Sequence, residues 1–541
     1  RIAVDLNGDV KGNVSDENVF EIEQGVAIIL LSTQGSLPGL RFASRIGTRR
    51  QKYSDLLDKE IVDVALAEAK VVPPYFRWVP FGSGGTEETS AEYSKWIPLG
   101  SVFTLKSSGI QTKNDPICIG WTANEVFLRA ERLAQLSEKE ARTEFGLDGS
   151  GAWSLAAAQS DLRSKGVSRK NIHRILYRPL DLRFIYYTSK SNGFIGRPRY
   201  DVMRHMLNKK NIGLLFNRQI VGDSISHFFV SRDLTCHGTF YLGNKGQDYL
   251  APLYLNDEDS LIAASDTGGR SNFSSAFIRT LAANLRRRVA ELTSEEIFSY
   301  LYGVVHSPRY RSRYAELLKI DFPRIPLTES QELFSALARL GGELVALHLL
   351  ESTKLDKHTI EFIGSRSLAV EKVFWSQETV WMDKAQTIGF RGVSEAVWDF
   401  RIGGYQVCEK WLKDRKGRTL TEDDIAHYQK IVVALGETIP LMKEIDEVIE
   451  RHGGWPGAFA SADHAAGEAE SAEPDSSTDV VAIAKPHRAT VLPRIAAEPV
   501  TTLLEAAGLD IPWTMQGRSL LPILQGRADP DLHKQAVVSE F

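Results

Sequence analysis

The chain has 541 residues, of which 43% are hydrophobic and 25% charged, and its formal net charge is -4. This globular balance excludes a collagen-like or wholly disordered chain, and the length predicts three or four domains. The longest aliphatic run, residues 26–31, is far shorter than the roughly 20 apolar residues of a membrane span, and the first twenty residues hold no signal-peptide core.

The N-terminal half is predicted to mix strands, helices and turns. Residues 2–4 and 26–31 have the apolar character of strands, whereas 52–70 and 123–145 have helical spacing. Residues 71–115 are rich in loop-forming Pro and Gly. Short β-type runs follow, and helices return between 275 and 301; the runs are 182–187, 212–216, 228–230 and 239–242. Because a strand pattern begins at the first residues and the chain starts with Arg1, we expect it to begin inside a domain.

The C-terminal half is predicted to be more helical. Thr328 with Gln331 makes a capping box for a helix to about residue 350, and Thr421 with Asp424 opens a longer one. Pro440 is expected to kink or split that longer helix. One face of it is apolar, at Ile425, Tyr428, Ile431, Val432 and Leu435.

Between and after these helices lie a predicted hairpin and a predicted linker. Residues 370–375 and 379–383 are typical of two paired strands. Residues 456–479 are rich in Ala, Ser, Gly and acids, which indicates a flexible linker. The three cysteines, Cys118, Cys236 and Cys408, lie far apart and are expected to be reduced, mostly buried thiols of a cytoplasmic protein.

Positive charge is concentrated in one segment. Residues 161–218 hold fourteen Lys or Arg and three Asp, a local balance of +11, which leaves -15 for the rest. Seven aromatic residues are interleaved with these charges. Such asymmetry predicts a basic face that binds a polyanion, with nucleic acid favoured. Smaller clusters at 286–288 and at Arg309, Arg311 and Arg313 are interpreted as solvated faces with a few ion pairs.

Several stretches together resemble the target-recognition part of Type ISP restriction-modification enzymes, which join a nuclease, a motor, an adenine-specific DNA methyltransferase and a specificity domain in one chain. The strongest is Tyr-Arg-Pro-Leu-Asp-Leu-Arg at 177–183 with Arg-Pro-Arg at 197–199. The others are at 18–28, 47–53, 108–115, 322–326, 402–407 and 411–418. The similarity spans about residues 1–455.

The resemblance implies a mixed α/β fold in several parts. Residues 1–115 would be the C-terminal remnant of the methyltransferase domain, with a partial methyltransferase-type sheet. Residues 116–327 would be a mixed α/β target-recognition domain and 328–455 its helical C-terminal part. A flexible linker at 456–485 and a tail at 486–541 would follow. The implied partner is double-stranded DNA, and S-adenosylmethionine, ATP and Mg are implied for the full-length family; no membrane is expected.

The sequence lacks the chemistry of an adenine methyltransferase. Such an enzyme needs a Gly-rich cofactor turn and an Asn or Asp before Pro-Pro-Tyr, because that side chain accepts from the amine of a flipped adenine. Residues 72–75 have Val at the decisive position, and the Gly-rich stretch 81–85 follows no buried strand. We therefore expect no catalytic residue and no cofactor in this chain.

Other catalytic and metal motifs are also missing. Asp63, Glu68 and Lys70 resemble a nuclease metal motif, but they fall inside one predicted helix and are interpreted as solvated charges. No His or Cys pair has zinc spacing, so no metal site is predicted, and no Gly-x-Ser-x-Gly elbow occurs.

The tail resembles a different family. Residues 502–509 and 516–522 are similar to the C-terminal region of sulfatases. That family requires a Cys or Ser followed two residues later by Pro or a small residue and then Arg, and none of the three cysteines has this context. The tail is therefore interpreted as a fragment without an active site, produced by a fusion or by an artefact of the sequence.

Six arginines are predicted to contact DNA, because Arg grips phosphates and reads guanine edges. They are Arg178, Arg183, Arg197, Arg199, Arg204 and Arg218. For Arg178 and Arg183 an ion pair with Asp181 is the structural alternative. His227 and His237 are interpreted as satisfied core or loop histidines, and the charges of 411–418 as a solvated helix end.

Three hypotheses remain open from sequence. The chain is a DNA-binding specificity module, which predicts sequence-selective, salt-sensitive binding without turnover. Alternatively it is half of a split methyltransferase, active only with a chain that supplies the cofactor half. The third is a non-functional gene remnant, which predicts insolubility through an exposed sheet edge.

Overall fold

The computed structural model describes most of residues 87–459 and short stretches before them. The described residues are 2–5, 17, 27–30, 40–45, 47–58, 67–69, 87–147, 152–207, 210–220, 225–240, 247–256, 269–356, 360–365 and 369–459. All belong to the first of two compact units, residues 1–465. The predicted linker is wrong at 456–459, where α17 (Gly454–Gly457) ends and Ala458 and Phe459 are buried in the core. The rest of that linker, the sulfatase-like tail, and the stretches 72–75 and 81–85 lie outside the described residues.

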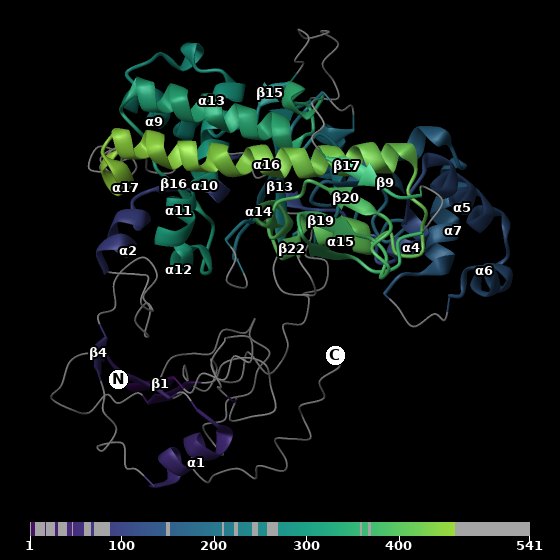
Figure 1. The fold of residues 1–541 in the computed structure, drawn as a ribbon, viewed down its shortest axis with the longest axis horizontal. Helices are drawn as coiled ribbons and strands as arrows, with labels where there is room; N and C mark the ends of the chain where they lie inside the picture. The colour runs from purple at the N-terminus through teal and green to yellow at the C-terminus, as the bar shows by residue number, and fades with distance from the viewer. Residues whose placement is uncertain are drawn as a thin grey trace, which may run out of the picture. The chain divides into compact units, whose positions relative to one another are not determined.

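The N-terminal stretch contains a small mixed sheet of order β2-β1-β3-β4 (Figure 1). β1 pairs antiparallel with β2 and parallel with β3, and β4 pairs antiparallel with β3. The bounds are β1 Ile2–Asp5, β2 Ala27–Leu30, β3 Leu40–Ser44, α1 Arg49–Asp58 and β4 Ala67–Ala69. The predicted helix over 52–70 is confirmed up to Asp58 and wrong at Ala67–Ala69, where Glu68 lies on β4 opposite Arg41. Strand pairing with β3 overrides the helical spacing there. The remainder of that stretch, with Asp63, lies outside the described residues.

Two four-stranded sheets form the centre of the described structure. One has the order β12-β8-β9-β7 and the other β11-β10-β13-β6. The strands of the first are Leu234–Thr235, Ile172–Arg178, Asp181–Tyr186 and Ile119–Gly120 in that order. Those of the second are Phe228–Ser231, Gly213–Asn217, Asp248–Pro252 and Ser107–Ser108. Strands predicted near 182, 212 and 228 are confirmed, whereas residues 239–240 form a bend and the rest of 239–242 lies outside the described residues.

Helices α5, α6 and α7 accompany the first sheet, and α5 packs on both β9 and α7. Their bounds are α5 Ala123–Gln135, α6 Glu138–Phe145 and α7 Leu155–Lys165. The predicted single helix 123–145 is thus two helices, because Ser137 starts α6 with a capping box to Glu140.

A helical layer packs beside the second sheet. Figure 1 shows α13 and α16 running side by side, and α10 packs closely on α13. At this contact a Cβ on Gly341 would lie 1.9 Å from Ser299 O, and one on Gly303 would lie 2.7 Å from Leu337 O. The two helix backbones can approach this closely because both crossing positions are glycine. The helices here are α2 Glu87–Ser94, α3 Leu99–Val102, α9 Ser275–Asn284, α10 Ser294–His306, α11 Pro308–Arg313, α12 Ala315–Leu318, α13 Gln331–His348, α16 Glu422–Arg451 and α17 Gly454–Gly457.

The cap of α16 follows the prediction, whereas that of α13 does not. The Thr421 hydroxyl accepts from Asp424 N, and Asp424 bonds back to Thr421 N. The predicted split at Pro440 is wrong, since α16 continues through it to Arg451. The predicted capping box at Thr328 is also wrong: Ser330 caps α13, and the buried Thr328 hydroxyl donates to Ala458 O at 3.1 Å.

A small antiparallel sheet of order β17-β20-β19-β18 confirms the predicted hairpin near 374–381. Its strands are β17 Glu361–Ile363, β18 Phe374–Ser376, β19 Thr379–Trp381 and β20 Gly389–Arg391. Remaining short elements are α4 Asp115–Cys118, α8 Tyr200–Met203, α14 Glu395–Trp398, α15 Val407–Lys413, β5 Ile97–Pro98, β14 Tyr254–Leu255, β15 Arg270–Ser271, β16 Arg324–Ile325, β21 Arg401–Ile402 and β22 Tyr405–Gln406, and the 3-10 turns Arg169–Asn171, Arg204–Met206, Val289–Glu291 and Thr353–Asp356. The three cysteines are buried and unpaired with one another, as predicted.

The architecture is mixed α/β, as predicted. Two large apolar clusters form the core, one around the β8–β9 sheet, α5 and α15, the other around α10, α13 and β10. The long helix α16 contributes Ile431 to the first and Ile445 to the second. This helix therefore joins the strand-rich and helix-rich parts of the described structure.

Candidate nucleic-acid interface

Three segments far apart in sequence run side by side in the basic part of the chain. Ile110 N donates to Thr235 O at 2.8 Å, and His237 N donates to Ile110 O at 2.8 Å. On the other side of this segment, Gln111 and Arg197 exchange both backbone bonds, at 3.0 and 2.8 Å. Paired backbone groups hold the loop at Arg197 in a ladder that continues to the β8–β12 sheet.

Two glycines permit this close ladder. A Cβ on Gly109 would lie 2.5 Å from the backbone carbonyl carbon of Cys236, and a Cβ on Gly196 would lie 2.6 Å from Cγ of Lys113. Gly109 belongs to the stretch 108–115, and Gly196 directly precedes the Arg-Pro-Arg stretch. Gly109 therefore permits close approach to the backbone of Cys236, and Gly196 permits close approach of the Arg-Pro-Arg loop to Lys113.

Arg197 and Arg199 form a concentrated positive patch on this ladder. Arg197 is exposed, and Arg199 is half-buried, with a φ of 54° at the N-cap of α8. Burial lowers the pKa of Arg199, and the nearby charge of Arg197 lowers it further. The buried Nε of Arg199 has no hydrogen-bond partner. An anion placed here would relieve both the repulsion and the unmet donor.

His237 lies against the same two arginines. Burial lowers the pKa of its ring, and Arg199 and Arg197 lower it further, so the imidazole is neutral near pH 7. Its Nδ1 is buried without a hydrogen-bond partner, so the prediction of a satisfied histidine is wrong for that atom. His227 lies buried in the core, and burial lowers its pKa to about 3. Arg197, Arg199 and His237 are together called the loop patch below.

Arg178 borders the segment 108–115 from the end of β8. Its guanidinium lies over the ring of Tyr177 at 4.1 Å and that of Tyr405 at 5.4 Å, and it donates to Tyr177 O at 2.7 Å. The Tyr177 hydroxyl donates to Asp115 Oδ2 at 2.9 Å, which ties β8 to the segment. The ion-pair partners of Asp181 are Arg183 and Arg415 rather than Arg178, and Nε of Arg178 is buried with no hydrogen-bond partner. Aromatic faces thus hold the side chain of Arg178 in place, and its Nε can still donate a hydrogen bond.

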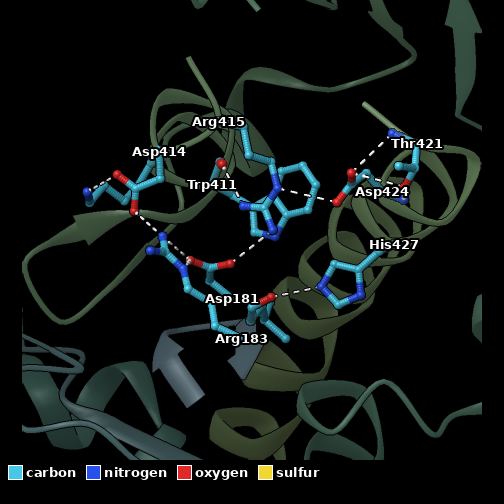
Figure 2. Close-up of polar contacts among 10 residues, drawn as sticks. Asp181, Arg183, Trp411, Asp414, Arg415, Thr421, Asp424 and His427 are labelled. Atoms are coloured by element: carbon cyan, nitrogen blue, oxygen red, sulfur yellow. Dashed lines mark hydrogen bonds and ion pairs between the residues drawn. The ribbon is translucent and has the colours of Figure 1, made fainter. Parts of the chain in front are cut away.

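Arg183 forms an ion pair with Asp181, which was the structural alternative to DNA contact. It bonds Asp181 through Nε and Nη2 at 3.0 and 2.8 Å, and Asp414 at 3.2 Å (Figure 2). Its guanidinium also lies 4.0 Å from the ring centroid of Trp121, and its side chain is 12% exposed. Its described contacts are those of a structural ion pair, while contact with DNA stays a prediction.

Arg415 completes a buried charge network around Asp181. Its Nη2 bonds Asp181 Oδ1 at 3.0 Å, and its guanidinium lies 3.3 Å from the centroid of Trp411 (Figure 2). Asp424, at the start of α16, lies 3.5 Å from Arg415 Nε. Burial lowers the pKa of Arg415, and the carboxylates oppose that change. The predicted solvated helix end is therefore wrong for Arg415, which is buried.

This network, here called the Asp181 network, joins the hairpin β8–β9 to α15 and α16. His427 on α16 adds a bond from Nε2 to Leu180 O at 2.9 Å, in the hairpin turn. Cations and carboxylates alternate in it, so each buried charge has an opposite partner; its members are Asp181, Arg183, Asp414, Arg415 and Asp424. Such a network gives little net stability over an apolar core, yet breaking one partner is costly.

The last two predicted arginines are Arg204 and Arg218. Arg204 is half-buried in the 3-10 turn after α8. Arg218 has a 58% exposed side chain and an ion pair with Asp321 at 2.9 Å. An exposed pair of this kind is weak, so a phosphate can compete for Arg218.

The smaller basic clusters follow their prediction of ion pairs. Arg288 pairs with Glu291, Arg309 with Glu450, and Arg313 with Glu92 at 3.3 Å. Arg311 instead donates from Nε to Val305 O at 2.8 Å.

Sequence reasoning missed two residues of this region. Trp121 lies against Arg183, Arg415 and Arg418 at 4.0, 4.7 and 4.5 Å, and no local pattern indicates this. Lys113 is exposed next to Gly196, and its Nζ donates to Asn192 Oδ1 at 3.4 Å. Its position inside the stretch 108–115 was the signal that could have identified it.

Within the ranges that the structure describes, no group of three or more His, Cys, Asp or Glu is arranged to hold a metal ion. None of the helices in those ranges has the length and apolarity of a bilayer span.

Comparison with known proteins gives one family and a set of similar folds. A family model described as the Type ISP C-terminal specificity domain matches residues 101–444. A DrdV–DNA complex has a TM-score of 0.58 at 18% identity, covering 82% of this chain and 47% of that one. A nuclease-deletion mutant of the Type ISP enzyme LlaGI with a DNA substrate mimic has 0.55 at 19%, covering 82% and 43%. The ATP-dependent Type ISP enzyme LlaBIII bound to DNA has 0.58 at 17%, covering 83% and 30%.

The chain thus spans less than half the length of these three proteins, and at these identities the likeness establishes the fold. No curated protein matches the sequence.

Proposed function

The chain belongs to the family of Type ISP C-terminal specificity domains, and on that premise we propose that it recognises a base sequence in duplex DNA for a restriction-modification enzyme. The observation that carries the proposal is the loop patch, where Arg197 is exposed and Arg199 has an unmet buried donor. The similar solved structures are themselves described as DNA complexes, which supports the same partner.

The arrangement suggests a division of work among the arginines. Arg197 is exposed on a loop fixed by backbone bonds, so its fork can reach a base edge or a phosphate without ordering the loop first. Arg178 and Arg199 are half-buried and already positioned, which lowers the entropy lost on contact. Arg218, with its weak ion pair, suits a phosphate at the edge of the interface.

Adenine methylation would belong to the assembly of which this domain is part. The sequence contains neither the cofactor turn nor Asn or Asp before Pro-Pro-Tyr, so we assign S-adenosylmethionine, ATP and Mg to other parts of such an enzyme. A separate chain that supplies the methyltransferase half is the alternative partner. The N-terminal sheet β2-β1-β3-β4 is our candidate for the methyltransferase remnant, and a cytoplasmic location is proposed from the three free thiols.

The test is selection of the purified chain against a random duplex-DNA library at several salt concentrations. We expect one short site to be enriched, with affinity falling steeply as salt rises because bound phosphates release counterions. Arg197→Ala should weaken this binding. The control is Arg391→Ala, which should not weaken it: Arg391 is an exposed arginine on β20 that pairs with Glu361 of β17. A folded chain that enriches no site would overturn the proposal.

A further inference from the structure

A cavity of about 450 Å³ lies apart from the loop patch, among β8, β9, β11, the end of α13 and α16. Its apolar wall comes from both large core clusters and from the hairpin turn; these residues are Leu176, Leu180, Leu182, Phe229 and Leu350. This volume is within the range of small-molecule sites. The cavity is therefore large enough for a small aromatic molecule.

Two leucines of this wall have backbone conformations that favour glycine. Leu180 in the β8–β9 turn has a φ of 60°, and Leu350 after α13 has a φ of 58°. Each is strained relative to a glycine at the same place. Glycine would remove the strain but also the side chain that lines the cavity. Strained residues of this kind cluster at ligand clamps.

Charged side chains of both signs border the cavity, with positive charge in excess. Among the described residues that line it, Arg174 pairs with Asp233 at 3.4 Å, and Arg232 pairs with Glu351 at 2.6 Å. Lys430 adds a further cation, whose nearest carboxylate, on Asp356, is 4.0 Å away and 74% exposed. The rim therefore favours one negative group.

The two histidines in the lining do not alter this balance. Burial lowers the pKa of His348 to about 3, with Arg311 contributing, and burial also lowers that of His427. His348 is committed on both ring nitrogens, to Tyr302 at 2.5 Å and Thr438 at 3.1 Å. The walls are thus uncharged inside and charged only at the rim.

We propose that this cavity binds a small amphipathic anion, with its apolar body among Leu176, Leu182 and Phe229 and its carboxylate, sulfonate or phosphate group beside Lys430. Arg197, Arg199 and His237 do not line the cavity, so failure of one proposal leaves the other standing. It requires no change in the described backbone, because the cavity is already formed.

The experiment titrates the full chain with 8-anilinonaphthalene-1-sulfonate, and in parallel with N-phenyl-1-naphthylamine, which has the same rings without the sulfonate. We expect one saturable site for the sulfonate by fluorescence. Leu182→Trp should fill the cavity and abolish it, whereas Leu128→Trp, at a half-exposed leucine on α5, should not.

A second pair of variants tests the anionic group and does not depend on the cavity-filling variant folding. Lys430→Gln should weaken sulfonate binding about tenfold, the size expected for one charged contact, and leave the neutral probe unchanged. Lys443→Gln, at an exposed lysine on the same helix, should change neither. Non-saturable binding, or sulfonate binding equal in the two glutamine variants, would overturn the proposal.

Discussion

The loop patch and the Asp181 network use the same residue type in opposite ways. Arg197 is exposed and sits beside another arginine, whereas Arg415 is 4% exposed, stacked on Trp411 and bonded to Asp181. Both regions come from stretches that resemble the same family. The comparison teaches that arginines in such stretches serve one of two roles. Some present their charge to solvent, and others hold together the elements that carry the exposed ones.

The largest expected effect is on the Asp181 network. Arg415→Ala leaves Asp181 buried with one fewer partner, so we expect about 3–5 kcal/mol less unfolding free energy. Urea denaturation measures this. Arg418→Ala is the matched control, because Arg418 also lies over Trp121 but is exposed. An equal loss of unfolding free energy in Arg415→Ala and Arg418→Ala would contradict the structural role given to the buried arginine.

The next effect is on DNA affinity rather than on stability. Arg197→Ala should leave the unfolding free energy within about 0.5 kcal/mol, because its side chain is exposed. Affinity for the selected site should fall by about 1–3 kcal/mol if Arg197 reads a base, with relaxed preference at one position. A uniform loss with a salt slope smaller by about one would instead assign it to a phosphate. Unchanged affinity would remove Arg197 from the interface.

A smaller effect concerns pH. In the free protein the pKa of His237 lies below its ordinary value of 6.5, so the ring is neutral at pH 7. Phosphate beside Arg197 and Arg199 would raise that pKa, so binding takes up a proton, and affinity should rise as pH falls below about 6.5. We expect roughly threefold tighter binding at pH 5.5 than at pH 7.5. The uptake of one proton can change the binding free energy by at most about 1.4 kcal/mol per pH unit. The same rise in His237→Asn would show that another group is responsible.

The smallest effect is expected at Arg218. Its ion pair with Asp321 is exposed, so Arg218→Ala should change the unfolding free energy by less than about 1 kcal/mol. Thermal denaturation at low and high salt measures this, since high salt should screen the ion pair and remove the difference in stability between the wild-type chain and the variant. A loss of several kcal/mol would place Arg218 with the structural arginines instead.

Several features of the fold follow from neighbouring residues and could be predicted. The cap of α16 needs only Thr421 and Asp424, and the apolar face of that helix, from Ile425 to Leu435, is buried as its spacing indicates. The hairpin near 374–381 and the buried thiols follow in the same way. The stretches 108–115 and 197–199, identified by their resemblance to the family, lie side by side in the folded chain.

Other features depend on partners that no local pattern contains. The Thr328 hydroxyl bonds Ala458, 130 residues away, so Ser330 caps the helix instead. Glu68 lies on a strand because β3 pairs with its neighbours.

By itself, then, the sequence determined the family, the basic segment and those elements whose stabilising contacts lie within a few residues. The tertiary structure decided which arginine is structural and which is presented. Arg183 meets Asp414, 231 residues along the chain, and the ring of Trp121, whereas Arg197 meets a backbone ladder and a second arginine. The free energy of a guanidinium depends on whether water, a carboxylate or an aromatic face surrounds it, and only the folded chain sets those surroundings.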